Sequence, residues 1–540
     1  MKIIKLSYFS LVLACLAGCG EPNSNKAQEL SKDVDKSTDS VVSDDPELLG
    51  LTQTQCTASL VNTVTVSPRG QLYIDAPAVL NDNRTKNHSS TAATGTSNDE
   101  AGVWSFAFAM REIMETFRPT ATVPLTSAQI DVEDLAVKSF IDRFGPVTVN
   151  SQPLVDRSTT RSTLLSAWGK KTTATGQKLL WWGGAPFKLV AIVNRMDIVK
   201  FTGTGSVDPT TAGEGRLVFG FTGKSRMTVI LEYNLPVGTS SPSSRTQAGW
   251  TNQWHSLKNN LVDTDAVRTG IQPDQSLGSP NQTFTVAYSN QPTYLNTLQA
   301  VTNGFVLRGS QVRSRTTSIS GAVVVVNQAA ISQIRTNEFI QSPWELREIG
   351  RGRDSLGKAV LQSLTVKNNV FTGSSSMAVR SDVNLGAWID ANVICTSTGV
   401  SSCKFNFPNR MLPATITSNG STFRIGGNSL EDFNQWFPAP ADLSNLKRRF
   451  FALESCDGCH QSETRIGFTH TDPRNGAPSG FIVGTTQLPN GSELPPDLTR
   501  RLNNFRNLVC LASATETLSL SAGESVAPLS RRTDFSTSVH

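Results

Sequence analysis

Two cysteines and a histidine stand close together near the end of the chain, in the sequence CDGCH at 456–460. Thiolates and imidazoles are good ligands for transition metals. A further histidine follows ten residues after the first. A Cys2His2 set of the kind that holds zinc is therefore formed by Cys456, Cys459, His460 and His470. The two cysteines can instead close a tight disulfide, with both histidines in structural roles.

The same five residues resemble the haem attachment motif of c-type cytochromes. The resemblance implies thioether bonds from Cys456 and Cys459 to one haem, because two intervening residues space the sulfurs to reach its two vinyl groups. It also implies that His460 lies under the iron as the proximal ligand. Helices expected before and after the motif agree with a small cytochrome c-like module. The resemblance favours haem c, with zinc and a disulfide as the alternatives.

The motif does not specify the distal ligand of such a haem. All seven methionines precede the motif, so the methionine ligand usual in small cytochromes c is missing downstream. His470 is a candidate distal ligand, which gives a low-potential haem with two histidines. The alternatives are a five-coordinate iron or a ligand from the rest of the chain. Arg465 and Arg474 are candidates for pairing with the haem propionates.

The N-terminus has the pattern of an export signal. Two lysines precede an apolar stretch over residues 6–16, which is too short to span a bilayer as a stable helix. Leu-Ala-Gly-Cys at 16–19 resembles the lipobox of bacterial lipoproteins, which implies cleavage before Cys19 and its acylation, detectable with palmitate. Gly20 follows instead of aspartate, and by analogy with enteric bacteria this favours the outer membrane. No later stretch approaches the roughly 18 apolar residues of a membrane helix.

The charge balance limits the partners. Forty-nine basic and 44 acidic residues give a net charge of +5, which falls to near +3 without the two lysines of the signal. So small a surplus argues against nucleic acid as a partner. The expected partners are the membrane, through the lipid, and a redox partner protein.

The remaining cysteines suggest disulfides, because an exported chain folds in an oxidising compartment. Cys395 and Cys403 enclose a short loop of Thr, Ser and Gly and are expected to pair. If the motif cysteines hold haem, Cys56 and Cys510 are left to each other. That bond would tie the start of the folded region to its last helix.

Helices and strands are both expected. Apolar residues recur three and four apart, as in amphipathic helices, over residues 103–117, 128–144, 246–262, 384–394, 443–453 and 498–509. Runs typical of strands lie at 179–233, with a turn at 222–225, and at 283–370, where they include TFTVAY, GFVLRG and AVVVVN. The sequence thus predicts an α+β fold with a β-rich main domain and a small helical C-terminal module.

Composition sets the expected boundaries of the parts. Polar stretches with few large apolar residues are typical of flexible segments. The expected parts are a signal peptide at 1–18, a lipid-anchored linker at 19–55, the α+β main domain at 56–435, the helical CxxCH module at 436–515 and a flexible tail at 516–540.

Two motifs, VNRMD and GEGRLVFG, place charges beside strands that look buried. Their arginines, Arg195 and Arg216, are expected to form buried salt bridges. An envelope enzyme that uses Asp197 and Glu214 is a weaker alternative. GKS at 223–225 is similar to the end of a phosphate-binding loop, but it joins two strands, so a turn is expected.

Several phrases together resemble a group of uncharacterised bacterial proteins that are secreted or lipid-anchored: VNRMD, GEGRLVFG, RTNEF, WELREI and the FTHTDPR segment after the motif. This resemblance implies no activity. The predicted function is a cell-envelope lipoprotein with one covalently bound c-type haem, for electron transfer or haem-based sensing rather than catalysis. The alternative is a non-redox binding or structural lipoprotein whose C-terminal module is stabilised by zinc or a disulfide.

Overall fold

The computed structural model describes parts of the chain between residues 64 and 522. The described residues are 64, 66–90, 97–120, 122–149, 152–198, 211–237, 246–260, 262–263, 286–287, 291–310, 315–319, 322–326, 329–342, 344–364, 366–371, 382–396, 403–406, 415–427, 446–453, 455, 459–460, 469–484, 486–487, 493–494 and 496–522. All of them belong to one compact unit that begins at Leu51. The predicted signal peptide and the boundary expected at 435/436 lie outside the described residues.

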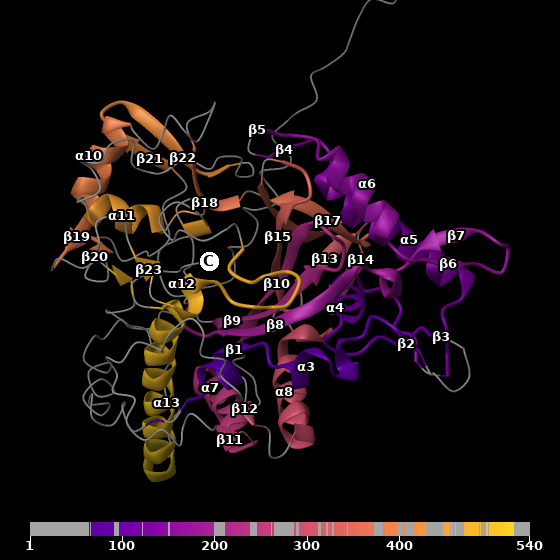
Figure 1. The fold of residues 1–540 in the computed structure, drawn as a ribbon, viewed down its shortest axis with the longest axis horizontal. Coiled ribbons are helices and arrows are strands. Elements are labelled where there is room, and N and C mark those ends of the chain that lie inside the picture. The colour runs from indigo at the N-terminus through magenta and orange to yellow at the C-terminus, as the bar shows by residue number, and fades with distance from the viewer. Residues whose placement is uncertain are drawn as a thin grey trace, which may run out of the picture. The chain divides into compact units, whose positions relative to one another are not determined.

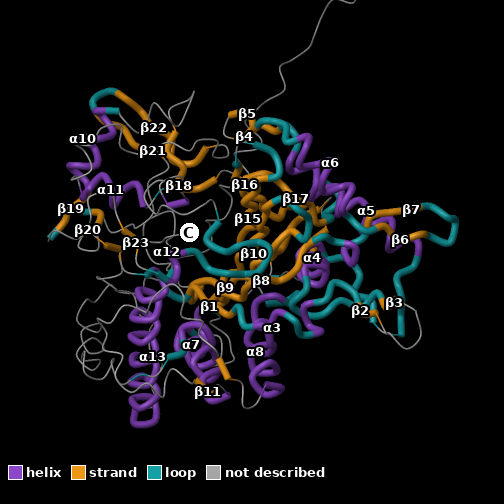
Figure 2. Tube along the Cα trace, in the orientation of Figure 1, coloured by secondary structure: helices purple, strands orange, loops and turns teal. Residues whose placement is uncertain are grey.

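A seven-stranded antiparallel sheet forms the centre of this unit (Figures 1 and 2). Its strands in spatial order are β1 (Tyr73–Ile74), β8 (Phe187–Arg195), β9 (Thr211–Phe221), β10 (Arg226–Pro236), β15 (Ile331–Phe339), β16 (Glu345–Arg353) and β17 (Ala359–Leu364). β8, β9 and β10 confirm the strands expected before residue 233. Residues 222–225 connect β9 to β10, which confirms the turn expected there.

The two faces of this sheet differ in polarity because successive side chains of a strand point to opposite sides. On one face, Leu217 and Phe219 of β9 belong to the main hydrophobic core. On the other face, Arg216 lies opposite Glu232 of β10, and Arg335 of β15 follows in the next strand. We call this second side the polar face. Residues 469–479, which follow the cysteine motif in the sequence, lie against the polar face.

The described helices are α3 (Pro77–Leu80), α4 (Phe106–Met114), α5 (Ser127–Ile141), α6 (Ser158–Ala167), α7 (Gln247–Ser256), α8 (Gln291–Val306), α10 (Val383–Asn392), α11 (Leu446–Leu453), α12 (Gly480–Val483) and α13 (Asp497–Ala522). One-turn helices are η2 (Pro68–Leu72), η3 (Asn83–Thr85), η4 (Asp142–Phe144), η5 (Trp182–Gly184) and η7 (Leu257–Asn260). The helices expected near 103–117, 128–144, 246–262, 384–394, 443–453 and 498–509 are confirmed.

Side-chain caps explain where two of these helices begin. The Ser105 hydroxyl accepts a hydrogen bond from the backbone N–H of Phe108 at the start of α4. Thr126 and Gln129 form a reciprocal capping box at the start of α5. Such caps satisfy N–H groups that have no partner within the helix.

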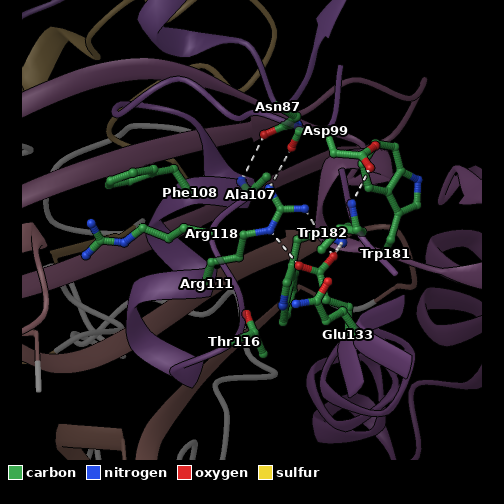
Figure 3. Close-up of polar contacts among 12 residues, drawn as sticks. Asn87, Asp99, Ala107, Phe108, Arg111, Thr116, Arg118, Glu133, Trp181 and Trp182 are labelled. Atoms are coloured by element: carbon green, nitrogen blue, oxygen red, sulfur yellow. Dashed lines mark hydrogen bonds and ion pairs between the residues drawn. The ribbon is translucent and has the colours of Figure 1, made fainter. Parts of the chain in front are cut away.

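A buried ion pair joins α4 to α5 (Figure 3). Nε of Arg111 donates to Glu133 at 2.5 Å, and both side chains are almost fully buried. Glu133 also accepts from the backbone N–H of Trp182 at 3.0 Å, while Arg111 donates to the carbonyl of Asp99 at 3.1 Å. Through these hydrogen bonds the Glu133 carboxylate holds α4, α5 and the backbone at Trp182 together.

One segment that was predicted to be a strand is partly helical. GFVLRG was expected to be a strand, but its first three residues are the last three of α8. Tyr294, Leu298, Val301 and Phe305 recur four, three and four residues apart and are all buried, which is the helical pattern. Phe305 reaches the sheet at Gly215, where a Cβ would lie 2.6 Å from its ring.

The other strands pair in short ladders outside the main sheet. They are β2 (Ser89–Ser90) with β3 (Ser97–Asn98), β4 (Val147–Val149) with β5 (Gln152–Leu154), β6 (Lys170–Thr172) with β7 (Lys178–Leu180), β11 (Val262–Asp263) with β12 (Val286–Ala287), β13 (Arg315–Ile319) with β14 (Ala322–Val326), β19 (Val393–Cys395) with β20 (Cys403–Phe405), β23 (Thr486–Gln487) with β24 (Glu493–Leu494), and the trio β18 (Val366–Phe371), β22 (Ser421–Gly427) and β21 (Thr415–Ser418). Sheet and helices together confirm an α+β fold.

The region around the cysteine motif belongs to two hydrophobic cores. α11, which leads into the motif, packs with α10, β19–β20 and β21–β22 in a smaller core around Phe423 and Phe451. Cys459, α12 and the first half of α13 instead belong to the main core of the sheet. None of the described helices, α13 included, combines the length and apolar character that a membrane span requires.

Candidate functional site

The second cysteine and the histidine of the motif lie together in a buried turn after α11. The backbone N–H of Cys459 donates to the carbonyl of Ser455 at 3.0 Å. Cys459 is fully buried and only 5% of the His460 surface is exposed. The His460 ring lies against Trp344, which directly precedes β16, with ring centres 5.5 Å apart. Cys456 lies outside the described residues.

His470 reaches the motif from a separate turn segment, which spans residues 469–479. A bridge between Thr471 and Pro478 closes this segment. Gly476 has a φ of +78°, a conformation that glycine adopts without strain. The backbone N–H of Ser479 donates to the His470 carbonyl at 2.8 Å. The turn therefore holds the histidine at a defined place.

Three of the four predicted ligand side chains meet. Sγ of Cys459 lies 3.4 Å from Nε2 of His470, within hydrogen-bond distance for sulfur. The rings of His460 and His470 have centres 4.7 Å apart, so they are in contact. On its other side, the His470 ring lies 5.1 Å from Phe481, centre to centre.

The surroundings of His470 favour its neutral form. Burial of the imidazole and the neighbouring His460 hold its pKa well below the usual range. Arg501 and Arg195 act in the same direction, against the opposing charge of Asp497. A neutral imidazole has a lone pair for a metal or a thiol proton.

The 469–479 segment is docked on the polar face of the sheet, where Figure 1 shows it in gold in front of β9 and β10. A Cβ added at Gly220 of β9 would lie 1.8 Å from the Pro473 carbonyl oxygen, so only glycine allows this approach. The hydroxyls of Tyr73 and Thr471 share a hydrogen bond of 2.8 Å. The sheet therefore positions the segment that carries His470.

A cavity of about 60 Å³ separates the two histidines from the polar face. It is lined from the sheet mainly by Arg216, Thr228, Ile230, Glu232, Arg335 and Asn337, and from the C-terminal part by His460, His470, Thr471, Ile482 and Arg501. This is room for a few waters or one small ligand. A porphyrin ring is much larger, so a haem macrocycle does not fit in this cavity.

The charged motifs form buried ion pairs, as expected. Nε of Arg195 donates to Asp197 at 2.8 Å. Nη2 of Arg216 donates to Glu214 at 2.7 Å and lies 3.2 Å from Glu232. Because these carboxylates are engaged by arginines, the site offers no support for an enzyme that uses Asp197 and Glu214.

Of the two predicted disulfides, the structure describes both cysteines of one and a single cysteine of the other. Cys395 and Cys403 form a disulfide, as predicted, across the β19–β20 pair. Cys510 of α13 is also disulfide-bonded. Its predicted partner Cys56 lies outside the described residues, as does Cys19, so that pairing and the lipidation stay predictions.

The contact between the rings of His460 and His470 leaves no space for a haem ligated by both histidines. His460 is buried directly after Cys459, where an axial ligand is needed. A porphyrin cannot enter between His460 and His470 while their rings are in contact, so ligation by both requires the 469–479 segment to move. Within the described residues, no three His, Cys, Asp or Glu side chains are grouped closely enough to hold a metal ion.

Arg474, one of the two predicted propionate partners, is not brought to this site. Arg474 is exposed and its guanidinium lies 3.4 Å from Asp472 in its own turn, while Arg465 lies outside the described residues. The buried arginines of the cavity, Arg216, Arg335 and Arg501, were not expected there. Their only signal was their place in strands or a helix of mixed polarity, which does not say what they face.

No protein-family model, curated protein or solved structure matches the chain.

Proposed function

We propose that the chain is an exported, lipid-anchored protein of the cell envelope that carries one haem c and serves in electron transfer or haem-based sensing. The observation that carries the proposal is the meeting of Cys459 and His460, both buried, with His470 from a separate segment. In the c-type motif these two positions are those of the second thioether sulfur and of the histidine that ligates the iron.

In this proposal Cys456 and Cys459 would hold the haem through thioethers and His460 would ligate its iron. The bound haem supplies a one-electron redox couple. Burial of His460 against Trp344 limits water at the ligand and raises the influence of nearby charges. The neutral His470 is close enough to become the second ligand after a movement of its segment, or to contact a small molecule beside the first.

A zinc site is the second candidate, and one distance favours it. Two ligands of one tetrahedral zinc, a thiolate sulfur at 2.3 Å and an imidazole nitrogen at about 2.05 Å, lie about 3.6 Å apart. The distance between Sγ of Cys459 and Nε2 of His470 is 3.4 Å. A thiol–imidazole hydrogen bond has a similar length, so the metal content must decide between the two.

The proposed haem is tested with the full chain expressed together with the haem-attachment machinery. Haem is expected to stay on the polypeptide through denaturing electrophoresis, because thioethers survive unfolding. Cys456→Ala or Cys459→Ala should weaken or abolish attachment, and His460→Ala should remove an axial bond and change the visible spectrum. A colourless protein with one zinc per chain would show that the Cys2His2 set binds zinc and not haem. A protein with neither would leave a structural disulfide or thiol turn.

The position of His470 has its own spectroscopic test. If it is a second axial ligand, the reduced protein shows a sharp low-spin band, which His470→Ala converts to a high-spin spectrum open to added ligands. If His470 is only a neighbour of the haem, the spin state of the wild-type protein is already high and the substitution leaves it unchanged. Ser479→Ala removes a weaker contact at Nδ1 and serves as the matched control.

The lipid anchor is a separate part of the proposal. We propose that Cys19 is acylated and that the chain is attached to the outer membrane. Metabolic palmitate should label the full-length protein and should not label Cys19→Ala. Label that persists in Cys19→Ala would remove the anchor from the proposal without affecting the haem.

A further inference from the structure

The second cysteine and the histidine of the motif are covered in this structure. Cys459 is fully buried, and 5% of the His460 surface is exposed. His470 lies against both, with Nε2 at 3.4 Å from Sγ of Cys459 and its ring in contact with that of His460. The cavity beside the two histidines, of about 60 Å³, has room for a few waters. A larger group therefore reaches Cys459 and His460 only after a part of the chain moves.

The 469–479 segment, which carries His470, is held together by its own hydrogen bonds. The backbone N–H of Asp472 donates to the Ala477 carbonyl at 2.8 Å, and that of Gly476 donates to the Asp472 carbonyl at 2.9 Å. The Asp472 carboxylate also accepts from the backbone N–H of Arg474 at 2.8 Å. None of these bonds involves the sheet, so the segment can move as one unit without losing them.

The polar contact between this segment and the sheet is concentrated in one residue. The hydroxyl of Tyr73 in β1 shares a hydrogen bond of 2.8 Å with the Thr471 hydroxyl and donates to the Gly476 carbonyl at 3.3 Å. Across the described ranges, the hydrogen bonds between the sheet and residues 469–479 all involve Tyr73. The other contacts are backbone packing and a longer-range attraction of Asp472 to Arg226.

We infer that the 469–479 segment is a movable cover over the motif and that the Tyr73 hydroxyl is the latch that keeps it closed. Tyr73 is only 2% exposed, so water competes little for its two hydrogen bonds. Opening of the segment uncovers Cys459 and His460 and admits the haem. Only this last step rests on the proposed function, because the latch is defined by contacts within the chain.

The latch has a modest strength. A hydrogen bond between uncharged groups shifts an equilibrium by about two- to tenfold in a folded protein. Two such bonds keep the segment closed in most molecules, while a bound group of larger size can still displace it. Segments with few contacts open locally in this way while the rest of the fold stays intact.

The latch is tested by the rate at which N-ethylmaleimide labels Cys459 in the full chain produced without the haem-attachment machinery. Cys456→Ser serves as the parent, so that the motif contains a single thiol. The reagent reacts with the thiolate once it can reach it, so the rate follows the fraction of open molecules. Adding Tyr73→Phe is expected to raise the rate about tenfold, because the closed segment loses both hydrogen bonds. Mass spectrometry of the peptide that contains residue 459 measures the label.

Tyr294→Phe in the same parent is the matched control. It removes the hydroxyl of another buried tyrosine, which donates to the Gly70 carbonyl at 2.8 Å. A lost hydrogen bond at that place should leave the labelling rate of Cys459 within about twofold of the parent. An increase as large as that of Tyr73→Phe would show a general loosening of the fold and would overturn the latch.

A second variant guards against a folding defect of Tyr73→Phe. Thr471→Val removes the shared hydrogen bond from the side of the segment and should raise the labelling rate about threefold. The latch is also overturned if folded Tyr73→Phe is labelled no faster than the parent, or if Thr471→Val is not where that variant stands in.

The admission of haem is tested separately with trypsin on the haem-loaded full chain. Trypsin cuts after Arg474, whose side chain is 55% exposed, but the docked backbone of the segment resists cleavage until it opens. Cleavage after Arg474 is expected to be faster in the haem-loaded chain than in the chain without haem. Equal rates would show that haem is bound with the segment closed and would overturn this step. If no chain takes up haem, the proposed function fails, while the labelling of Cys459 still decides the latch.

Discussion

Gly220 and the Pro473 carbonyl oxygen are so close that a Cβ at residue 220 would lie 1.8 Å from that oxygen. The two residues belong to parts of the chain more than 250 positions apart. A second contact of the same kind joins Gly476 to the Val190 carbonyl of β8, where a Cβ would lie 2.4 Å away. Backbone thus packs directly on backbone where the 469–479 segment meets the sheet. The site of His470 depends on these two glycines.

We predict that Gly220→Ala displaces the 469–479 segment and destabilises the protein. Overpacking of a closely fitted contact costs about 1–3 kcal/mol. Urea unfolding should show this loss, and the segment should become sensitive to protease. Gly480→Ala is the matched control, because no atom lies within 4 Å of the added Cβ. Equal stability of the two variants would contradict the docked position of Pro473.

A second prediction concerns the ion pair of Arg111 and Glu133 (Figure 3). Glu133→Gln leaves the buried guanidinium without its counter-charge, and losing one member of such a pair costs about 3–5 kcal/mol. Asp131→Asn removes an exposed carboxylate from the same helix and should change stability by less than about 0.5 kcal/mol. Both are measured by denaturant unfolding. Similar effects in the two variants would show that Arg111 finds another partner.

The strands and helices were largely predictable from local patterns. The runs that form β8, β9 and β10 are rich in apolar residues, and the turn at 222–225 separates two of them. α8 was missed because the run FVL at its end looks like a strand when its neighbours are ignored. The four aromatic and aliphatic residues from Tyr294 to Phe305 contain the helical period that corrects this.

Only the C-terminal residues of the candidate site could be predicted from the sequence. Spacing alone pointed to Cys459, His460 and His470, because these residues lie within eleven positions of one another. Their partners on the sheet could not be found in this way. Tyr73 lies 398 positions before Thr471, to which it is hydrogen-bonded. Such pairs depend on strand register and on how the C-terminal segment docks, and neither is visible in one sequence.

The disulfide between Cys395 and Cys403 provides a third prediction. It closes a short loop, for which chain entropy gives roughly 2–3 kcal/mol of stabilisation. The pair belongs to the smaller core, together with α10 and α11. Reduction should therefore lower hydrogen-exchange protection in α10 and in β19–β20 while the central sheet keeps its protection. Parallel loss of protection in β9 and β10 would show that the two cores unfold as one.

A control for this prediction is the double variant Cys395→Ala with Cys403→Ala. It should show the lowered protection without any reductant, and reductant should change these elements no further. A further change on reduction would trace the effect to another disulfide, such as that of Cys510.

The last prediction is a dependence of stability on pH through Asp197. Burial raises the pKa of this carboxyl, but Arg195 and Arg500 outweigh burial and lower it from 3.8 to about 2. In the unfolded chain the pKa returns to about 3.9. The folded protein therefore binds fewer protons than the unfolded chain between these values. Stability from this group is complete above pH 4 and is lost as the pH falls toward 2.

The size of the effect follows from the shift, because each pKa unit corresponds to about 1.4 kcal/mol. Asp197 should thus contribute about 2 kcal/mol at neutral pH relative to pH 2. Asp197→Asn removes this part of the pH dependence, so the free energy of unfolding should fall less steeply between pH 4 and 2 than in wild type. At neutral pH the variant is also less stable, because Arg195 loses its partner. An unchanged slope in Asp197→Asn would mean that Arg195 and Arg500 do not hold this carboxylate in solution.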